Sequence, residues 1–294
     1  ILTFNARELA LQCLQSVSRV TTPNLTVVVV DNASSDGTYE ALVEANFNIR
    51  LICNQENLGF AGGNNVGIRM ALREGADYVV LLNQDTVVDP AFIDELVAQA
   101  EADRRAGFVC SKIYFLDQPN ILWFAGATFN TMTGRNRHIG HGQLDTGQYD
   151  HVREIARPCG CSLLITRELL DQVGVMEEKY FLYCEEIDWM LRARKKGFVA
   201  VMAPKSKVWH KVSPGMGGER SGNIIYYVTR NLLDCLDKNH PFRFPFASDL
   251  RTLLVLAVIF LSLFTMKISK TTGLRNLARG YLDYKKGRFG MKNH

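Results

Sequence analysis

The first hundred residues alternate between short apolar runs and stretches in which apolar positions recur every three or four residues. Continuous runs of apolar and β-branched residues are typical of strands covered on both faces of a sheet. Such runs lie at 25–30 (LTVVVV), 49–53 and 78–82 (YVVLL), and residues 1–2 have the character of a strand end. Helices are predicted between them, over 6–19, 38–46, 66–74 and 90–104. This alternation predicts an α/β fold with a doubly wound, mostly parallel sheet.

The pattern changes after residue 107. Strands are predicted at 108–115, 121–130, 161–166 and 198–202, and helices at 185–196 and 223–238. A polar stretch over 131–152 is predicted to be a long loop, and residues 208–222 a second loop containing four glycines.

Polar clusters follow all four of the N-terminal strands. They are TFN (3–5), DNASSD (31–36), NQENLGFAGGNN (54–65) and NQD (83–85). The carboxyl ends of parallel strands meet at one edge of a sheet, where such folds bind their ligands. The sequence therefore predicts one ligand site built from these four clusters.

The NQD cluster ends in Asp85, with an amide two residues earlier at Asn83. Mg²⁺ and Mn²⁺ prefer oxygen ligands, and they often take only one or two protein carboxylates when phosphates supply the rest. The alternative is a turn aspartate that caps the following helix.

A second cluster places three carboxylates within four residues, at Glu185, Glu186 and Asp188. Charges this close repel each other, so that the pKa of one carboxyl rises, which suits a general base. The alternative is a set of acids stabilised at the start of a helix. A single histidine such as His210, in the sequence VWH, indicates a ligand only if other site residues lie beside it.

The C-terminal region combines an apolar run with a basic tail. The net charge of the chain is +4, yet Lys267–His294 has eight Lys or Arg and one acid, which leaves the rest slightly acidic. The apolar run over 253–264 lies in a 15-residue stretch without charges, from 252 to 266. Such a helix is roughly 22 Å long, short of the roughly 30 Å hydrocarbon core. We expect a helix on a membrane surface, with the tail on anionic head groups; a helix docked on the protein's own core and a spanning helix are the alternatives.

Several function classes are disfavoured. The slightly acidic body argues against nucleic-acid binding. The stretch GFAGGNNVG lacks the spacing of a dinucleotide fingerprint, and no basic phosphate-binding loop of a nucleotidyltransferase is seen. Seven scattered cysteines with no C-x-x-C pair fit a reducing compartment, and Cys159 and Cys161 are expected at a strand edge rather than on zinc.

Taken in order, the motifs resemble those of family 2 glycosyltransferases of the GT-A fold, in the bacterial rhamnosyltransferase-like branch. The resemblance covers roughly residues 1–212 and rests on ILTFN, VVDNASSDGT, NLGFAGGNNVGI, YVVLLNQDT, the block from CGCSLLIT to RKKGF, and VWHKVS. The segment RGYLDYKKGRFG near the C-terminus is also similar to that branch.

The resemblance implies a role for each matching position. Asn32, Asn83 and Glu186 stand where the family commonly has Asp. The nucleoside pocket would be lined by Thr3, Asn5, Asp31 and Asn32, and the base and phosphates would lie near Asn57, Gly59, Gly62, Asn64 and Asn83. Mg²⁺ or Mn²⁺ would be held by Asp85 and His210, and the catalytic base would be Glu186, with Glu185 and Asp188 in reserve. Acceptor contacts are expected at Trp189 and the 131–152 loop, and closure over the donor at residues 213–222.

The resemblance further implies inverting, metal-dependent transfer of a sugar, expected to be L-rhamnose from dTDP-L-rhamnose. The acceptor would be a lipid-linked saccharide at the cytoplasmic face of the bacterial inner membrane, in surface polysaccharide synthesis. The alternatives are another donor (UDP-galactofuranose, a UDP-hexose or a GDP-sugar) and a non-catalytic sugar-nucleotide-binding protein on the same fold. The expected organisation is a glycosyltransferase domain over 1–240, divided at 106 into a nucleotide-sugar half and an acceptor half, followed by an apolar helix and basic tail over 241–294.

Overall fold

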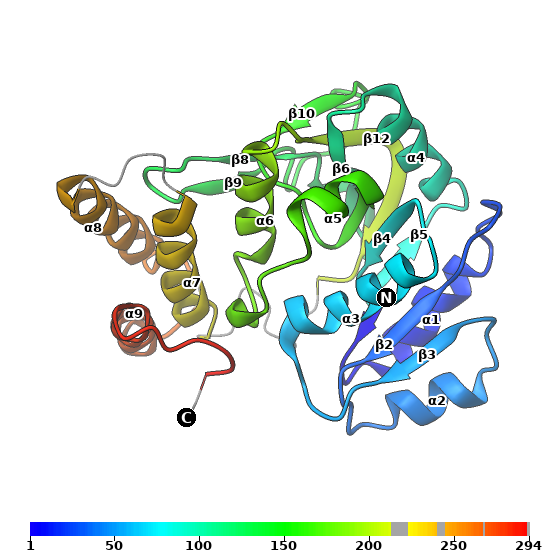
Figure 1. Cartoon of the computed structure of the whole chain (residues 1–294), viewed down its shortest axis with the longest axis horizontal. Helices are drawn as coiled ribbons and strands as arrows, with labels where there is room; N and C mark the ends of the chain where they lie inside the picture. The colour runs from blue at the N-terminus through cyan, green and yellow to red at the C-terminus, as the bar shows by residue number, and fades with distance from the viewer. Residues whose placement is uncertain (213–222, 240–244, 267, 293–294) are drawn as a thin grey trace.

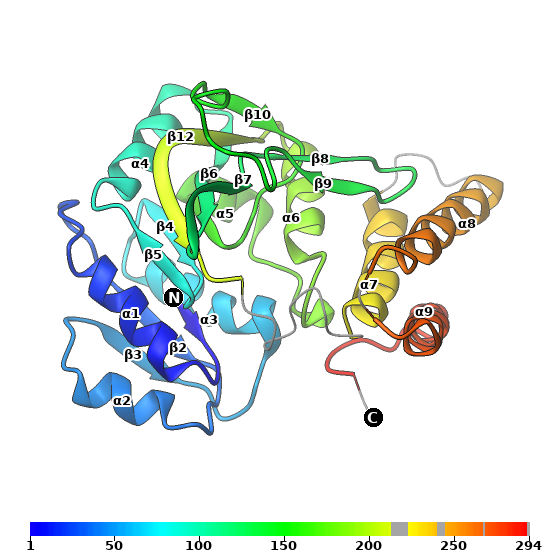
Figure 2. The ribbon, with the colours of Figure 1, turned by 180° about the vertical axis from the view of Figure 1, so that it is seen from behind.

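The structure is a computed structural model that describes residues 1–212, 223–239, 245–266 and 268–292. Both ribbon views show a sheet-bearing body with three helices, α7, α8 and α9, gathered at the end remote from β3 and α2 (Figures 1 and 2).

The N-terminal strands form a parallel sheet. Its order is β1 (Leu2–Thr3), β2 (Val28–Asp31) and β3 (Arg50–Cys53), connected through α1 (Arg7–Val17) and α2 (Thr38–Glu44). A parallel bridge from Leu2 to Asn83 joins β1 to the end of β4 (Tyr78–Leu82). The carboxyl ends of four strands therefore share one edge, as the sequence predicted.

The larger sheet is mixed. Its main path runs β10 (Arg153–Ile155), β12 (Val199–His210), β6 (Ala106–Phe115), β11 (Ser162–Thr166) and β4, with β5 (Thr86–Val88) on β12 and β7 (Gln118–Phe124) on β6. Among the described strands of this sheet, β6 and β12 pair in parallel and the other pairs are antiparallel. Parallel pairing thus holds for the N-terminal strands and gives way to mixed pairing beyond β4.

Helices cover this sheet and enclose its core. They are α3 (Gly59–Arg73), α4 (Phe92–Ala102), α5 (Arg167–Val173) and α6 (Glu185–Arg194), with a 3₁₀ turn, η1, over Glu178–Tyr180. Phe108, Leu164 and Trp189 are among the fully buried residues of the core. The hairpin of β8 (Ala127–Phe129) and β9 (Asn136–His138) extends toward α7 and α8 (Figure 2).

Three local predictions were wrong. The helix predicted from residue 66 begins at Gly59, so the glycine-rich stretch is helical. The strand predicted to end at 202 continues to His210, because its second half pairs with β5 and β6. The stretch 131–152 contains the strand β9.

The C-terminal helices α7 (Asn223–Asn239), α8 (Pro245–Ser262) and α9 (Lys270–Lys285) share an apolar cluster. The boundary predicted at 240 therefore separates α7 from the helices with which it packs. On α8, Arg251, Val255 and Ile259 are buried, while the opposite face exposes leucine and phenylalanine. Within the described residues, no helix is both long enough and apolar enough to span a bilayer.

Candidate active site

The ends of β1 and β4 are tied together by a side chain that the motif analysis did not assign a role. The Gln84 Oε1 accepts a hydrogen bond from the Phe4 backbone N–H at 2.8 Å. This bond lies just beyond the Leu2–Asn83 bridge, so it helps to fix the spacing between the first and fourth strand ends.

Asp31 and Thr3, two of the predicted nucleoside-pocket residues, are fully buried. The Asp31 carboxylate accepts from the Ser34 hydroxyl at 2.6 Å and from the Ser34 backbone N–H at 3.0 Å, which closes the turn after β2. Thr3 is equally buried, and its hydroxyl has no hydrogen-bond partner in the part of the chain that is described. Asn5 joins the same turn, since its Oδ1 accepts from the Ser35 N–H at 2.8 Å.

Asn32 organises the next loop. Its amide nitrogen donates to the Asn57 Oδ1 at 2.9 Å and to the Gly59 carbonyl at 3.1 Å. Its oxygen accepts from the Asn54 Nδ2 at 3.0 Å and from the Leu58 N–H at 3.1 Å. An aspartate could not donate the first two bonds, so the asparagine at this position fits the loop that it holds.

The start of α3 requires its first glycine. Gly59 has φ +72°, and a Cβ there would lie 2.3 Å from the Phe181 carbonyl oxygen. The Asn57 Oδ1 accepts from the Gly59 N–H at 2.8 Å, which fixes the turn directly before α3.

Gly62 and Asn64, predicted to lie in a loop near the phosphates, are instead inside α3. The Asn64 amide donates back to the Phe60 carbonyl at 2.9 Å and is buried. Asn64 is therefore a buried helix residue, which corrects the expectation of a loop at this position.

The two predicted metal ligands are brought together. The His210 Nε2 lies 3.2 Å from the Asp85 Oδ1, because β12 ends beside the tip of β4. The His210 ring packs edge-on against Trp123, with ring centroids 4.7 Å apart. No group of three or more His, Cys, Asp or Glu side chains suited to a metal occurs among the described residues. One carboxylate and one imidazole fit an ion that takes its remaining ligands from phosphates and water.

Glu186 is linked to the same edge through two adjacent residues. The Gly160 N–H donates to the Glu186 Oε1 at 3.1 Å, and the Cys161 carbonyl accepts from the Asn83 N–H at 3.0 Å. A Cβ on Gly160 would lie 3.0 Å from that Glu186 oxygen, so the glycine permits the approach.

Glu185, the neighbouring carboxyl, is in a different environment. Its side chain is almost fully buried, and its Oε2 has no hydrogen-bond partner within the described chain. Burial, with a smaller contribution from Glu186, raises the pKa of Glu185 well above its usual value. A raised pKa favours the protonated carboxyl, which makes Glu185 less suited than Glu186 to accept a proton.

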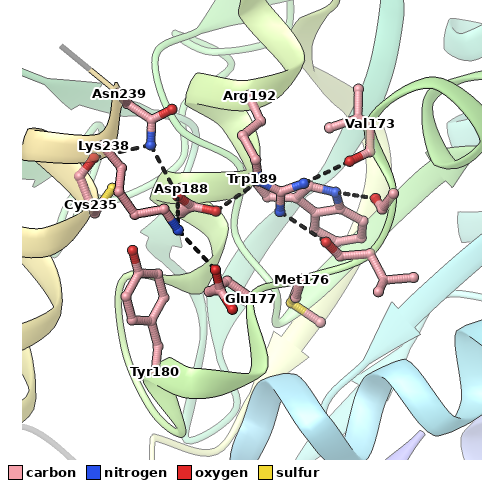
Figure 3. Close-up of polar contacts among 12 residues, drawn as sticks. Val173, Met176, Glu177, Tyr180, Asp188, Trp189, Arg192, Cys235, Lys238 and Asn239 are labelled. Atoms are coloured by element: carbon pink, nitrogen blue, oxygen red, sulfur yellow. Dashed lines mark hydrogen bonds and ion pairs between the residues drawn. The ribbon is translucent and has the colours of Figure 1, made fainter. Parts of the chain in front are cut away.

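Asp188 does not fit its reserve role as a base. It is completely buried, and its carboxylate binds the Arg192 Nε at 2.7 Å and the Asn239 Nδ2 at 3.0 Å (Figure 3). The Arg192 guanidinium in turn donates to the carbonyl oxygens of Val173 and Val175. This network ties α6 to α7 and to the turn after α5, and leaves Asp188 no access to an acceptor.

Trp189, an expected acceptor contact, is also a core residue. It is fully buried, and its indole N–H donates to the Gly174 carbonyl at 2.8 Å (Figure 3). Its ring packs edge-on against Phe108.

His138 of the 131–152 region lies near His210, because both rings pack on Trp123. The His138 Nε2 lies 2.9 Å from an Arg157 guanidinium nitrogen, and its ring packs on Trp123 with ring centroids 4.7 Å apart. Burial first, and the Arg157 charge second, lower the pKa of His138 to about 3, so the ring is neutral and accepts from Arg157. Residues 213–222, expected to close over the donor, lie outside the described residues.

A cavity of about 720 Å³ lies between β2 and β4. Its lining includes Thr26 and Val28 of the β2 region and the whole of β4, and it reaches Leu2, Val30 and Leu82, the residues next to the polar clusters.

The sequence profile described as "Glycosyl transferase family 2" matches residues 1–174, more than half of the chain. This chain belongs to glycosyltransferase family 2. The resemblance inferred from the motifs is thereby confirmed, and the chain is a glycosyltransferase.

Three curated proteins illustrate the relationship of this family 2 glycosyltransferase. The N-acetylglucosaminyl-diphospho-decaprenol L-rhamnosyltransferase of Mycobacterium tuberculosis H37Rv is 27% identical over 77% of this chain and 79% of its own length. The dTDP-rhamnosyl transferase RfbF of Shigella flexneri is 24% identical over 82% of this chain and 79% of its own. The low-salt glycan biosynthesis hexosyltransferase Agl10 of Haloferax volcanii is 30% identical over 58% of this chain and 53% of its own.

Solved structures confirm the GT-A fold of this family 2 glycosyltransferase. The mannosyltransferase PcManGT of Pyrobaculum calidifontis, in complex with GDP-Man and Mn²⁺, aligns over 98% of this chain and 81% of its own, with a TM-score of 0.54 at 16% identity. S. aureus TarS 1–349, in complex with UDP-GlcNAc, aligns over 97% and 90%, with a TM-score of 0.59 at 12% identity.

Proposed function

We propose that this glycosyltransferase transfers L-rhamnose from dTDP-L-rhamnose to a hydroxyl of a lipid-linked saccharide, with inversion at the anomeric carbon, in bacterial surface polysaccharide synthesis. The names of two relatives support this substrate pair. The Mycobacterium tuberculosis protein is named for L-rhamnose and a diphospho-decaprenol-linked sugar, and the Shigella flexneri protein for dTDP-rhamnose.

One observation supports the assignment of the catalytic groups above all others. The Gly160 N–H binds Glu186 while the adjacent Cys161 carbonyl binds the backbone of Asn83, two residues before Asp85. The proposed base and the proposed phosphate-binding edge are thus held by consecutive residues of one segment, which leads into β11.

In the proposed reaction, Glu186 takes the proton of the acceptor hydroxyl as its oxygen attacks the anomeric carbon. The bond from that carbon to the diphosphate oxygen breaks on the opposite face, and dTDP leaves. Asp85 and His210 would hold Mg²⁺ or Mn²⁺, which when bound supplies positive charge to stabilise the leaving diphosphate. The loops held by Asp31 and Asn32 line the edge where the nucleoside would lie.

The donor assignment is tested by calorimetric titration of the protein with dTDP, UDP and GDP, each with and without Mn²⁺. We expect metal-dependent binding of dTDP that is weakened in Asp85→Ala. The matched control is Asp117→Ala, which removes an exposed aspartate paired with Lys211. A preference for UDP or GDP would contradict dTDP-L-rhamnose as the donor and favour a UDP-sugar or GDP-sugar. Failure of the folded protein to bind any nucleotide would refute the donor site.

We further propose that the protein acts at the cytoplasmic face of the inner membrane and binds its surface through α8 and α9. The exposed face of α8 carries Leu250, Leu253, Leu254, Phe260 and Leu261, and Phe264 follows in the turn after it; each is between 37% and 65% exposed. Exposed cations follow on the neighbouring segment at Lys270, Arg275, Lys285, Lys286 and Arg288. Apolar side chains beside cations suit the boundary between acyl chains and anionic head groups.

Flotation with vesicles tests the membrane surface. We expect binding to phosphatidylcholine vesicles that contain phosphatidylglycerol, weakened by salt, and lost in the double variant Leu253→Glu, Leu261→Glu. The control double variant, Leu25→Glu with Val43→Glu, alters exposed apolar residues of the N-terminal part and should still bind. Equal loss in both variants would contradict a specific role of α8.

A further inference from the structure

The five residues before the carboxyl pair have an unusual backbone. Within this arch, residues 180–184, three non-glycine residues have left-handed φ values: Phe181 (+67°), Tyr183 (+65°) and Cys184 (+73°). L-residues rarely adopt this region because the side chain crowds the backbone, so such conformations persist only where the surroundings impose them. The arch leads directly into Glu185 and Glu186, the first residues of α6.

The arch is held by an asparagine of α7. The Asn231 amide nitrogen lies 2.9 Å from the Tyr180 carbonyl, 2.8 Å from the Leu182 carbonyl and 3.0 Å from the Tyr183 carbonyl. Its two N–H groups are therefore shared among three converging backbone acceptors. The side chain is fully buried, so no water substitutes for it.

Arg230 fixes the orientation of this amide. Its Nε donates to the Asn231 Oδ1 at 2.9 Å, which turns the amide nitrogen toward the arch. The same guanidinium donates to the Tyr180 carbonyl at 3.0 Å and to the Gly290 carbonyl at 2.9 Å. The Gly290 N–H donates to the Lys179 carbonyl at 2.8 Å, so the segment after α9 also supports the arch.

The opposite side of the arch contacts the donor side of the site. The Phe181 carbonyl accepts from the Phe60 N–H at 2.7 Å, at the start of α3. The Cys184 carbonyl accepts from the Asp188 N–H at 3.0 Å, which begins the hydrogen bonding of α6. The arch therefore connects the start of α3, the start of α6 and α7, and its shape sets the direction in which Glu186 leaves the backbone.

We propose that Asn231 is a positioning residue for the transfer reaction: it holds the strained arch in the one conformation that aims Glu186 at the acceptor. This inference rests on the proposed role of Glu186 as the base. It gives α7 a part in catalysis, although α7 carries none of the motif residues. A purely structural asparagine would support stability alone, and the two roles differ in what a substitution changes.

The chain offers a matched control in Asn65 of α3. Asn65 is also fully buried. Its Nδ2 donates to the Met176 carbonyl at 2.9 Å and to the Glu178 carboxylate at 3.0 Å, and its Oδ1 accepts from the Met176 N–H at 3.1 Å. It secures a turn that lies before the arch. Asn231→Ala and Asn65→Ala therefore remove comparable buried amides, only one of which holds the arch.

The test compares both variants with the unaltered protein in melting temperature, dTDP affinity, kcat, KM and hydrogen exchange of the amides at 182–186. We expect similar losses in melting temperature and retained dTDP affinity in both. Only Asn231→Ala should lose kcat, by about 10²-fold, the order expected for misplacing a catalytic group by about 1 Å. Exchange at 182–186 should accelerate only in this variant, and Asn231→Ser, which keeps one donor, should recover part of kcat.

Equal kcat losses in the two variants, or unchanged exchange at 182–186 in Asn231→Ala, would overturn the proposal. The exchange measurement needs no substrate, so it reports on the arch even if the donor is misassigned. Failure of the unaltered protein to bind nucleotide would instead count against the proposed function.

Discussion

The two sides of the candidate site are held in different ways. On the donor side, polar side chains of the strand ends bind residues of the same set of motifs: Asp31 binds Ser34, Asn32 binds Asn57, and Gln84 binds Phe4. On the base side, the arch before Glu186 is held by Asn231, 51 residues from Tyr180. The donor side carries its support within its motifs, whereas the base side depends on a helix outside them.

This difference predicts which parts of the site a substitution should affect. Substitutions on the donor side should act through one loop at a time. Substitutions on the base side should act through the arch, and the contact between Gly59 and Phe181 is one of the places where the two sides meet.

The largest effect is expected for Glu186→Gln, which removes the proposed base and keeps the shape of the side chain. Without a group to take the acceptor proton, kcat should fall by about 10²–10⁴-fold, with dTDP binding retained. Steady-state kinetics and calorimetry on the same preparation measure both. Turnover close to that of the unaltered protein would exclude Glu186 as the base.

Gly59→Ala should be the most damaging substitution where the two sides meet. A left-handed alanine costs about 1–2 kcal/mol, and crowding of the new Cβ against the Phe181 oxygen should add about 1–3 kcal/mol. The control is Gly75→Ala, because Gly75 has a similar φ of +81° and no neighbour within 4 Å of the added Cβ. Equal losses of unfolding free energy in urea would show that the Phe181 contact is unimportant.

Glu185→Gln should change the pH dependence of stability. The folded protein holds the Glu185 proton more tightly than the unfolded chain, so this contribution to stability is complete below about pH 4.5 and declines as pH rises toward the raised pKa. The slope is up to about 1.4 kcal/mol per pH unit. Glutamine lacks this decline, so the melting temperature of the variant minus that of the unaltered protein should increase between pH 4 and pH 8. A constant difference would contradict the raised pKa.

Ser34→Ala should have the smallest effect of the four. It deprives the buried Asp31 carboxylate of its hydroxyl donor, at a cost of about 1–2 kcal/mol, and should weaken dTDP binding without changing the exchange of the arch amides. Ser18→Ala, which removes an exposed hydroxyl bound to the Gln15 carbonyl, serves as the control. Faster exchange at 182–186 in Ser34→Ala would contradict the separation of the two sides.

The sequence was sufficient for the features that depend on local pattern. The apolar runs of β2 and β4 predicted strands, and the polar residues after them predicted a shared edge. Asp85 and His210 were matched through family motifs, and the structure places them side by side because β12 continues to the edge of the sheet.

Features that depend on distant contacts were missed. The glycines of 59–63 have the composition of a loop, yet they allow α3 to pack closely on Leu2 and Phe181. From their position beside the carboxyl pair, Trp189 and Asp188 were expected to contact substrate. In the structure Trp189 packs against Phe108, and Asp188 binds Arg192. Asn231 carried no signal at all, because its importance comes from the carbonyls that converge on it.

The adjacency of Gly160 and Cys161 also has a thermodynamic consequence. One residue donates to Glu186 and the next accepts from Asn83, so a displacement at either end is transmitted across a planar peptide. Donor and acceptor should therefore not bind independently. If bound dTDP changes the affinity of the protein for the acceptor by some factor, then bound acceptor must change the affinity for dTDP by the same factor.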